Sequence, residues 1–247
     1  MGKNNKLFIV GIGPGNPLQM SRLAYHVIGQ VDVIVGYKTY IYLIKEIISK
    51  KQEVYLSGMR QERERAAKAI NYVSQGKNAA IISSGDPGVY GMAGLVLELI
   101  DQQDDKIEVE VIAGITAANA AAAILGAPLM HDYTVISLSD LLTPWPLIEK
   151  RLEKSAEGDF ITVLYNPSST RRKEQIKIAW KILMEYRLVD TPVGIVRQAG
   201  REGQEKTLTT LAEMLEEEID MLTTVVIGNS QTYISKNKMI TPRGYKL

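Results

Sequence analysis

The chain has 247 residues, which is enough for one large domain or two modest ones. Hydrophobic residues make up 45% and charged residues 23%, as in ordinary globular proteins, which argues against a disordered or fibrous chain. The net charge of +1, from 29 basic and 28 acidic residues, argues against nucleic acid as a main partner. There is no Cys and there are two His, so thiolate catalysis, disulfides and the usual zinc sites are excluded, and we expect no metal site.

The amino terminus carries no targeting signal that we can identify. Lys6 stands where a myristoylation signal requires Ser or Thr, and the first apolar run is too short for a secretory signal. No later run is long and apolar enough to span a membrane. We therefore expect a cytoplasmic protein without a membrane partner.

In the first half of the chain, apolar strand-like runs alternate with helical periods. We expect strands at 7–11, 31–35, 53–56, 78–83 and 107–112, and helices at 17–30, 39–49, 60–75, 89–103 and 116–125. Asn16 before Pro17 is typical of a helix start, and Gly76 of a helix stop. This alternation predicts βαβ units and a mainly parallel, doubly wound sheet.

A break at 126–132 predicts a domain boundary, with one α/β domain at 1–128 and a second at 129–247. The second domain is expected to have strands at 133–138, 159–165, 192–197, 205–209 and 224–228, and helices at 145–156, 171–186 and 210–219. The short link at 198–204 suits antiparallel pairing, so this second sheet is expected to be mixed.

Two glycine-rich loops directly follow strand-like runs, at 11–15 and at 85–91. Glycine permits positive φ and a close approach of a ligand to the backbone, and ligands collect at the carboxyl ends of strands in open α/β sheets. The first loop lacks the dinucleotide fingerprint G-x-G-x-x-G, because Asn16 occupies the position of the third glycine. The acidic residue that would bind the ribose is also missing, since the next expected strand is followed by Gly36 and Tyr37. Pro14 also removes one potential phosphate donor.

Four further small polar loops follow expected strands, at 113–117, 166–169, 198–200 and 228–230. Turn preferences explain any one of them, but six together favour a binding site. Asp86 and Pro87 fit either a helix cap or the wall of a ligand site, and the two interpretations are compatible. The chain offers no nucleophilic triad and no Walker loop, so its chemistry would depend on placing two bound partners.

Three motifs carry a resemblance to a known family: they lie at 11–17, 84–91 and 114–117. Together they resemble the signatures of the tetrapyrrole methylases, in the right order and over nearly the whole chain. The resemblance implies a class III methyltransferase with two α/β domains, usually a homodimer, which uses S-adenosylmethionine in a cleft between the domains. The loops at 11–15 and 85–91 would then face each other across that cleft.

Further segments resemble the branch of this family that methylates C17 of a cobalamin-pathway macrocycle. These segments are Ser57–Gly58–Met59–Arg60 with Glu62 and Arg65, then 137–145, 164–167 and 197–203. Departures are small: Ala113 and Ser21 stand where Pro and Thr are common. The implied reaction is methyl transfer to C17 of precorrin-3B or cobalt-factor III, with an associated ring contraction. Cobalt is held by the macrocycle, so the sequence does not separate the two substrates.

The resemblance also implies which residues meet the cofactor, whose product is S-adenosylhomocysteine. They are Ser84, Gly85, Asp86, Val89, Tyr90, Thr116, Ala117, Tyr165, Asn166, Gln198, Ala199 and Gly200. Mostly neutral groups suit a sulfonium, because a carboxylate against the sulfur would stabilise the ground state more than the transition state. The tetrapyrrole would meet Gly13, Pro14 and Gly15.

The macrocycle bears carboxylates, which arginines could clamp through bidentate pairing. The candidates are Arg60, Arg171 and Arg197, with Arg172 and Arg201 as further choices, and a solvated face is the alternative role for each. Ring contraction requires a general acid or base, for which Asp140, with Ser137, is the candidate; the alternative for Asp140 is a helix cap. Trp145 suits either packing or a wall of the macrocycle site.

Two other functions remain as alternatives. An RNA ribose methyltransferase would use a similar cofactor site, but it should have a basic face that the balanced charge does not suggest. A non-enzymatic nucleotide sensor could share the glycine loops, but it would have no use for the segment at 137–145.

Overall fold

The computed structural model describes residues 5–102, 106–170 and 172–246. The chain forms two compact units, Met1–Ala117 and Ala118–Leu247. The sequence predicted the boundary at 128. The division comes earlier because Ala118, Ala121 and Leu125 of helix α5 (Ala117–Leu125) pack in a core cluster with strands of the second unit.

The first unit is built on a five-stranded parallel sheet in the order β3-β2-β4-β1-β5. The strands are β1 (Lys6–Gly11), β2 (Val33–Tyr37), β3 (Glu53–Ser57), β4 (Ala79–Ser83) and β5 (Glu108–Ile112). The central strand β4 is buried along its whole length, as expected where helices cover both faces of a parallel sheet. The predicted doubly wound parallel sheet is confirmed.

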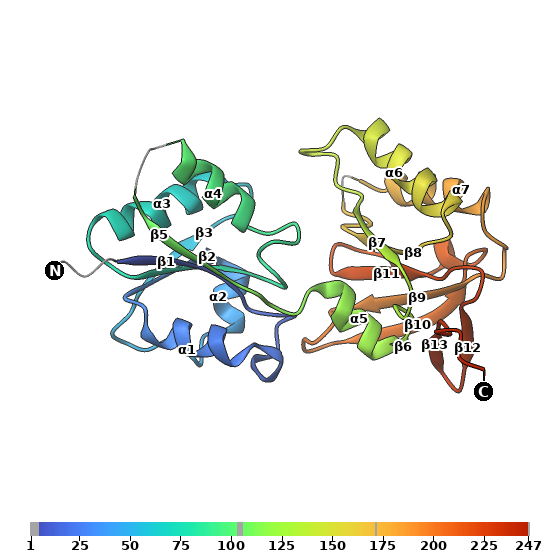
Figure 1. The fold of residues 1–247 in the computed structure, drawn as a ribbon, viewed down its shortest axis with the longest axis horizontal. Helices are drawn as coiled ribbons and strands as arrows, with labels where there is room; N and C mark the ends of the chain where they lie inside the picture. The colour runs from blue at the N-terminus through green and yellow to red at the C-terminus, as the bar shows by residue number, and fades with distance from the viewer. Residues whose placement is uncertain (1–4, 103–105, 171, 247) are drawn as a thin grey trace. The chain divides into compact units, whose positions relative to one another are not determined.

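Helices cover both faces of this sheet (Figure 1). Helices α3 (Glu62–Ser74) and α4 (Ala93–Asp101) share one core cluster with Leu7 and Ile9. Helices α1 (Arg22–Gln30) and α2 (Lys38–Leu43) share another with Val10. Because side chains alternate along a strand, β1 supplies both layers, and its carboxyl end is left at the edge of the sheet.

The second unit contains a mixed five-stranded sheet in the order β10-β9-β11-β8-β7, as predicted. The strands are β7 (Tyr133–Ser137), β8 (Ile161–Tyr165), β9 (Pro192–Arg197), β10 (Glu205–Thr210) and β11 (Thr223–Ile227). Strands β7 and β8 are parallel, whereas β11 runs antiparallel to both β8 and β9. Helices α6 (Trp145–Glu157) and α7 (Glu174–Met184) pack on one face and α5 on the other (Figure 1).

Several elements differ from the prediction. The helix predicted at 17–30 is split into a 3₁₀ turn (Pro17–Gln19) and α1, because the Ser21 side chain accepts from Ala24 N and starts a new helix. The helix predicted at 210–219 is reduced to a 3₁₀ turn (Met214–Glu216); in a longer helix, Glu213 and Glu217 would form an unfavourable i,i+4 pair of like charges. The cap at Asn16 is confirmed, as is the stop at Gly76, whose φ is 89°.

A small third sheet was not predicted. It joins β12 (Tyr233–Ser235), β13 (Lys238–Ile240) and β6 (Gly126–Ala127). Strands of two or three residues are too short to show a period, so the sequence gives no signal for them. The predicted helices at 89–103 and 171–186 include positions 103 and 171, which lie outside the described residues.

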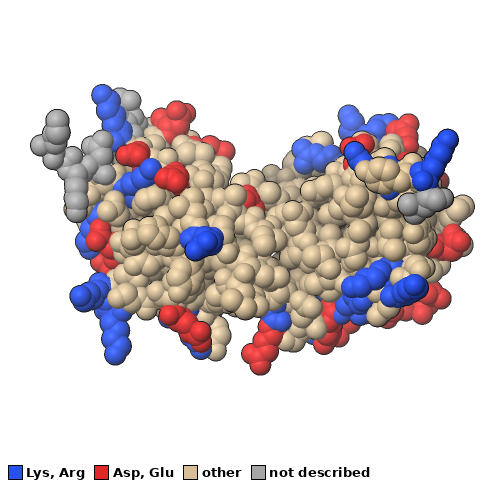
Figure 2. All heavy atoms as spheres, turned by 60° about the horizontal axis from the view of Figure 1, so that its bottom comes forward, with Lys and Arg blue, Asp and Glu red and all other residues tan. Residues whose placement is uncertain are grey.

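The surface carries charges of both signs. Figure 2 shows Lys and Arg side chains interspersed with Asp and Glu on the face that it draws, in keeping with the net charge of +1. Within the described part of the chain, none of the helices is both long and apolar enough to cross a membrane.

Candidate functional site

Three loops of the first unit meet at the carboxyl edge of its sheet. We name them the Gly13 loop (residues 11–16), the Gly85 loop (84–91) and the Gly114 loop (113–117); they follow β1, β4 and β5. Gly13 N donates to Gly85 O at 3.1 Å, and Gly85 N donates to Gly13 O at 2.7 Å. The expectation that these two loops face each other across a cleft is therefore wrong. They bond directly, because β1 and β4 are adjacent parallel strands.

The three loops approach so closely that side chains are excluded between them. A Cβ on Gly114 would lie 2.1 Å from Gly85 O, and a Cβ on Gly11 would lie 2.7 Å from both Gly114 N and Gly85 O. Gly85 also has a φ of +67°, a conformation that other residues rarely adopt. Glycine at these positions thus makes a rigid edge formed mainly by backbone.

Asp86 ties two of these loops together. Its Oδ1 accepts from Gly88 N at 2.8 Å, and its Oδ2 accepts from Gly114 N at 2.9 Å. The helix-cap interpretation is wrong, because the chain makes turns from Pro87 to Met92 and α4 begins only at Ala93. Both carboxylate oxygens are already engaged by N–H groups, so the negative charge of Asp86 is stabilised within the protein.

The structure brings together the predicted cofactor residues of this unit. Thr116 Cα and Ala117 N would lie 3.7 and 3.8 Å from a Cβ on Gly85. Val89 and Tyr90 project from the Gly85 loop with 36% and 61% of their surface exposed. The arrangement offers backbone polar groups, small side chains and one aromatic ring to a ligand.

The Gly13 loop differs from its predicted role in one respect. Gly13 and Pro14 are buried, and Gly15 is half-buried. The accessible part of the segment is formed by the following residues, where Leu18 is 92% exposed. Leu18 was not among the predicted site residues; it lies in the short 3₁₀ turn that Asn16 caps.

In the second unit, the carboxyl ends of β7, β8 and β9 lie at one edge, because these three strands run in the same direction. Asn166 Nδ2 donates to Ser137 Oγ at 2.9 Å, and Tyr165 OH accepts from Ala118 N at 2.7 Å. Asn166 and Gln198 both have a φ of 50°, so both turns after the strands are left-handed. The predicted residues Tyr165, Asn166 and Gln198 are thus at the same edge.

Asp140 is exposed, and its Oδ2 accepts from Gln175 Nε2 at 3.2 Å. It does not cap a helix, because α6 begins at Trp145, with Pro144 before it. Ser137 is buried, with 9% of its surface exposed, and Trp145 packs against the core cluster beneath α6 and α7. Of the two predicted catalytic residues, Asp140 is the accessible one.

The predicted arginines have different surroundings. Arg197 Nε lies 2.9 Å from Asp220 Oδ2, and Glu205 and Glu218 lie within 3.8 Å of its guanidinium. The hydrogen bond to Asp220 raises the pKa of Arg197. Three carboxylates of its own chain would therefore compete with a substrate carboxylate for Arg197. Arg60 is exposed, and Arg171 lies outside the described residues.

Arg172, a further choice at the sequence level, has neutral partners. Its guanidinium donates to Leu138 O at 3.1 Å and contacts Met221 Sδ at 3.4 Å. It therefore links the segment after β7 to the segment before β11, at the same edge as Tyr165 and Asn166.

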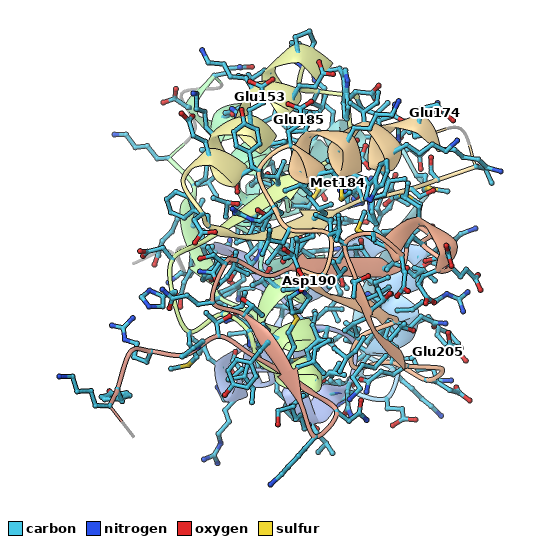
Figure 3. All side chains as sticks on the ribbon, turned by 90° about the vertical axis from the view of Figure 1, so that its right-hand side faces the viewer. Glu153, Glu174, Met184, Glu185, Asp190 and Glu205 are labelled. Carbon is cyan, nitrogen blue, oxygen red and sulfur yellow. The ribbon has the colours of Figure 1, made fainter. Side chains whose placement is uncertain are left out.

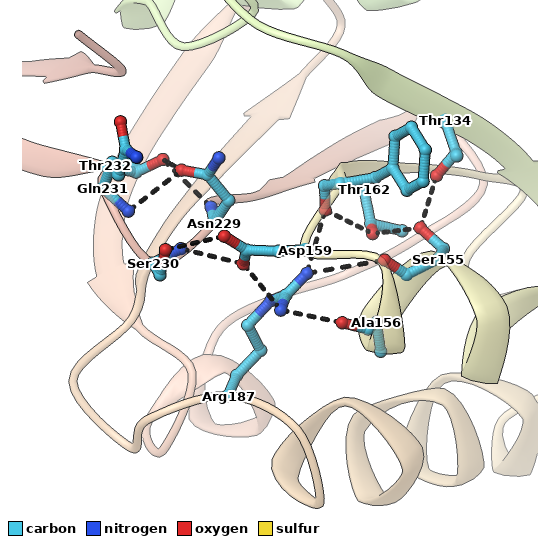
Figure 4. A network of polar contacts seen from close by, with 11 residues as sticks. Thr134, Ser155, Ala156, Asp159, Thr162, Arg187, Asn229, Ser230, Gln231 and Thr232 are labelled. Carbon is cyan, nitrogen blue, oxygen red and sulfur yellow. Dashed lines mark hydrogen bonds and ion pairs between the residues drawn. The ribbon is translucent and has the colours of Figure 1, made fainter. Parts of the chain in front are cut away.

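The loop at 228–230 is not part of this cluster. It follows β11, whose antiparallel direction leaves its carboxyl end at the opposite edge, where Ser230 bonds to Asp159. Asp159 also pairs with the buried Arg187 at 2.8 Å, in the network of Figure 4. A cavity of about 380 Å³ lies at this edge, near the turn that carries Asp190 (Figure 3). The cavity therefore lies away from the cluster formed by Tyr165, Asn166 and Asp140.

The family model described as Tetrapyrrole (Corrin/Porphyrin) Methylases matches residues 6–215. A Salmonella typhimurium protein named probable cobalt-factor III C(17)-methyltransferase is 49% identical over 241 residues, which cover 98% of this chain and 100% of that protein. A Priestia megaterium protein named cobalt-factor III methyltransferase is 50% identical over 98% of this chain, which spans 45% of that relative's length.

More distant matches have the same kind of name. A Sinorhizobium precorrin-3B C(17)-methyltransferase is 36% identical over 97% of this chain and 96% of its own length. Among solved structures, that of the methyltransferase CobJ matches with a TM-score of 0.92 at 32% identity, covering 96% of this chain and 100% of that chain.

The glycine contacts predict the effect of a single methyl group. Gly114→Ala places a Cβ against Gly85 O, so we expect the free energy of unfolding to fall by about 3 kcal/mol or more. Gly94→Ala, on an open face of α4, is the matched control and should raise the free energy of unfolding by roughly 0.5–1 kcal/mol. Urea denaturation measures both. Equal stability of the two variants would contradict the packing described.

The Asp220 carboxylate predicts a pH dependence. Burial raises the pKa of Asp220, but hydrogen bonds from Arg197, Thr223 and Leu222 N outweigh it, so the pKa is lowered overall. A carboxyl whose pKa is lower in the folded than in the unfolded state adds to the free energy of unfolding. This contribution is complete above the unfolded-state pKa of about 4, and it is lost as the pH falls through the lower pKa of the folded state. Asp220→Asn should therefore cost about 1 kcal/mol at pH 7 and progressively less in acid.

The measurement is the free energy of unfolding from pH 7 down to about pH 3. Asp190→Asn, at an exposed aspartate, is the control and should match the wild type throughout. A constant difference between Asp220→Asn and wild type across this range would contradict the role of the Arg197 ion pair.

Proposed function

Because the chain belongs to the tetrapyrrole methylase family, we propose that it transfers a methyl group from S-adenosylmethionine to C17 of a cobalamin-pathway tetrapyrrole and assists the associated ring contraction. The observation that carries the proposal is the 49% identity to the cobalt-factor III C(17)-methyltransferase of Salmonella, which extends over the full length of that relative. The motifs at 57–65 and 137–145, which distinguish the C17 branch, support the same reaction.

The Gly85 and Gly114 loops are proposed to bind the methyl donor. They combine backbone groups with small side chains, and the Asp86 carboxylate in their midst is engaged by Gly88 N and Gly114 N. When bound, S-adenosylmethionine supplies an activated methyl group on a sulfonium. Because this positive charge is lost as the methyl leaves, a neutral environment avoids stabilising the ground state preferentially. The residues of these loops that we propose to line the donor site are Ser84, Gly85, Asp86, Val89, Tyr90, Thr116 and Ala117.

The second unit is proposed to complete the donor site with Tyr165, Asn166, Gln198, Ala199 and Gly200. Support comes from the family resemblance and from their common position at the carboxyl edge of β8 and β9. The left-handed turns at Asn166 and Gln198 leave backbone groups at the edge of the sheet. The same resemblance leads us to propose a cytoplasmic homodimer.

Substrate recognition is proposed to use guanidinium groups that have no carboxylate partner. Arg60 and Arg172 form no ion pair with any described residue, whereas Arg197 is held by Asp220. Gly15 and Leu18 of the adjoining segment are proposed to meet the macrocycle surface, and Arg171 stays a candidate on sequence grounds. Relatives named for cobalt-factor III are 49% and 50% identical, against 36% for the precorrin-3B enzyme, which favours the cobalt-containing substrate.

Asp140 is proposed to move the proton required by ring contraction. It is exposed, it follows β7 at the same edge as Asn166, and its neutral partner Gln175 leaves its charge available. Ser137 is buried and accepts from Asn166, so we assign it to positioning that side chain.

The proposal is tested by incubating the protein with S-adenosylmethionine and cobalt-factor III under anaerobic conditions, with precorrin-3B in a parallel reaction. We expect the mass of the macrocycle to increase by one methyl group with cobalt-factor III, and a ¹³C-labelled donor to place that methyl at C17. A reaction without S-adenosylmethionine is the control. Absence of methylation with both substrates would refute the function.

Asp140→Asn should slow the formation of the ring-contracted product without weakening the binding of the methyl donor. We expect kcat for the ring-contracted product to fall by about 10²-fold, since general acid–base catalysis contributes on this order. The affinity for S-adenosylmethionine should not change, because, among the described residues, Asp140 bonds to Gln175 and to none of those proposed to bind the donor. Asp190→Asn is the control. A changed donor affinity with unchanged kcat would exclude Asp140 as the proton carrier.

A further inference from the structure

Arg65 is a buried cation at the carboxyl edge of the first sheet. It lies in the first turns of α3 and is 4% exposed. Its guanidinium contacts neutral groups, and within the described ranges it makes no ion pair with a carboxylate. Of the residues in the motif at 57–65, only Arg60 has been given a role in the proposed function, and Arg65 has none.

The contacts of Arg65 reach the ends of three neighbouring strands. Its Nε donates to Ser57 Oγ at 2.5 Å, at the last residue of β3, and one terminal nitrogen donates to Gly58 O at 3.0 Å, directly after β3. Its other terminal nitrogen contacts Met92 Sδ at 3.5 Å, on the far side of the Gly85 loop from β4. The ring of Tyr37, the last residue of β2, lies 5.9 Å from the guanidinium carbon.

Burying this charge is costly, because neutral partners do not replace a counter-ion. The chain shows the ordinary solution elsewhere, since buried Arg187 has Asp159 at 2.8 Å. Replacing buried ionic groups with well-packed apolar side chains is often neutral or stabilising, so packing alone does not require an arginine here. Its planar fork instead fixes several acceptors in one geometry.

Met92 connects Arg65 to the Gly85 loop. Met92 N donates to Ser83 Oγ at 3.2 Å, and the next residue, Ala93, donates to Pro87 O at 2.9 Å. These bonds close the loop at the point where α4 begins. The side chain of Met92 is 6% exposed, so its sulfur is held against Arg65 by the surrounding core.

We infer that Arg65 is a positioning residue, which holds the turn after β3 and the Gly85 loop in one arrangement. That turn carries exposed Met59 and Arg60, whose φ of 62° is left-handed. Arg65 thereby fixes a substrate-facing turn relative to the loop that binds the methyl donor. The inference rests on the proposed function for the identity of the donor.

The experiment compares wild type, Arg65→Met and Arg65→Lys, with Arg63→Met as the matched control on the exposed face of the same helix. Hydrogen exchange of the full chain without ligand should be at least tenfold faster in residues 57–61 and 84–92 of Arg65→Met, and unchanged in β5. The KM for S-adenosylmethionine should rise about tenfold at a temperature where all variants are folded. Arg65→Lys should fall between Arg65→Met and wild type, because it keeps the charge but loses the fork.

Three outcomes would overturn the inference. They are exchange in 84–92 within twofold of wild type, faster exchange throughout the first unit including β5, or a KM for S-adenosylmethionine within twofold of wild type. An effect of equal size in Arg63→Met would overturn it as well. If the wild type binds no S-adenosylmethionine, the proposed function fails, and the exchange measurement alone decides whether Arg65 couples the two segments.

Discussion

The close backbone packing of Gly11, Gly85 and Gly114 is the constraint on which the first unit depends. A Cβ on Gly114 would lie 2.1 Å from Gly85 O, so the loops after β1, β4 and β5 can meet only without side chains between them. Paired hydrogen bonds between Gly13 and Gly85, and the bridge from Asp86 to Gly114 N, hold this arrangement. Its geometry is set by backbone rather than by rotamers, which suits the precise placement of a reactive group.

In the second unit, the polar edge at the carboxyl ends of β7, β8 and β9 is held together mainly by side chains rather than by backbone groups. Side chains do most of the bonding there: Asn166 to Ser137, Tyr165 to Ala118 N, and Arg172 to Leu138 O. Because β11 is antiparallel to its neighbours, the polar loops of this unit are divided between two opposite edges. Only the edge with β7, β8 and β9 carries the residues that match the proposed chemistry.

The surroundings of the charged residues near the proposed site fit a reaction between a cationic donor and an anionic macrocycle. The one carboxylate within the glycine loops, Asp86, has both oxygens engaged by backbone N–H groups, whereas Arg60 and Arg172 are without carboxylate partners in the described structure. Arg197, which has the same chemistry in the sequence, is held by its own acids. Identical residue types therefore serve different purposes according to their neighbours.

Much of the fold could be predicted from the sequence, because βαβ alternation and buried apolar strands are strong local signals. The parallel first sheet and the mixed second sheet were both predicted correctly. The roles of Asp86 and Arg197 could not be predicted, since their partners at Gly114 and Asp220 lie over 20 residues away along the chain. The split after Gln19 and the short strand β6 also depend on contacts that no periodicity reveals.

The most direct test of the account is a crystal structure with S-adenosylhomocysteine. We expect the ligand to lie against the backbone of residues 84–89 and 116–117, with Asp86 still bonded to Gly114 N. Ligand bound elsewhere, for example in the cavity beside Asp159 and Arg187, with the glycine loops unchanged and free of ligand, would contradict it.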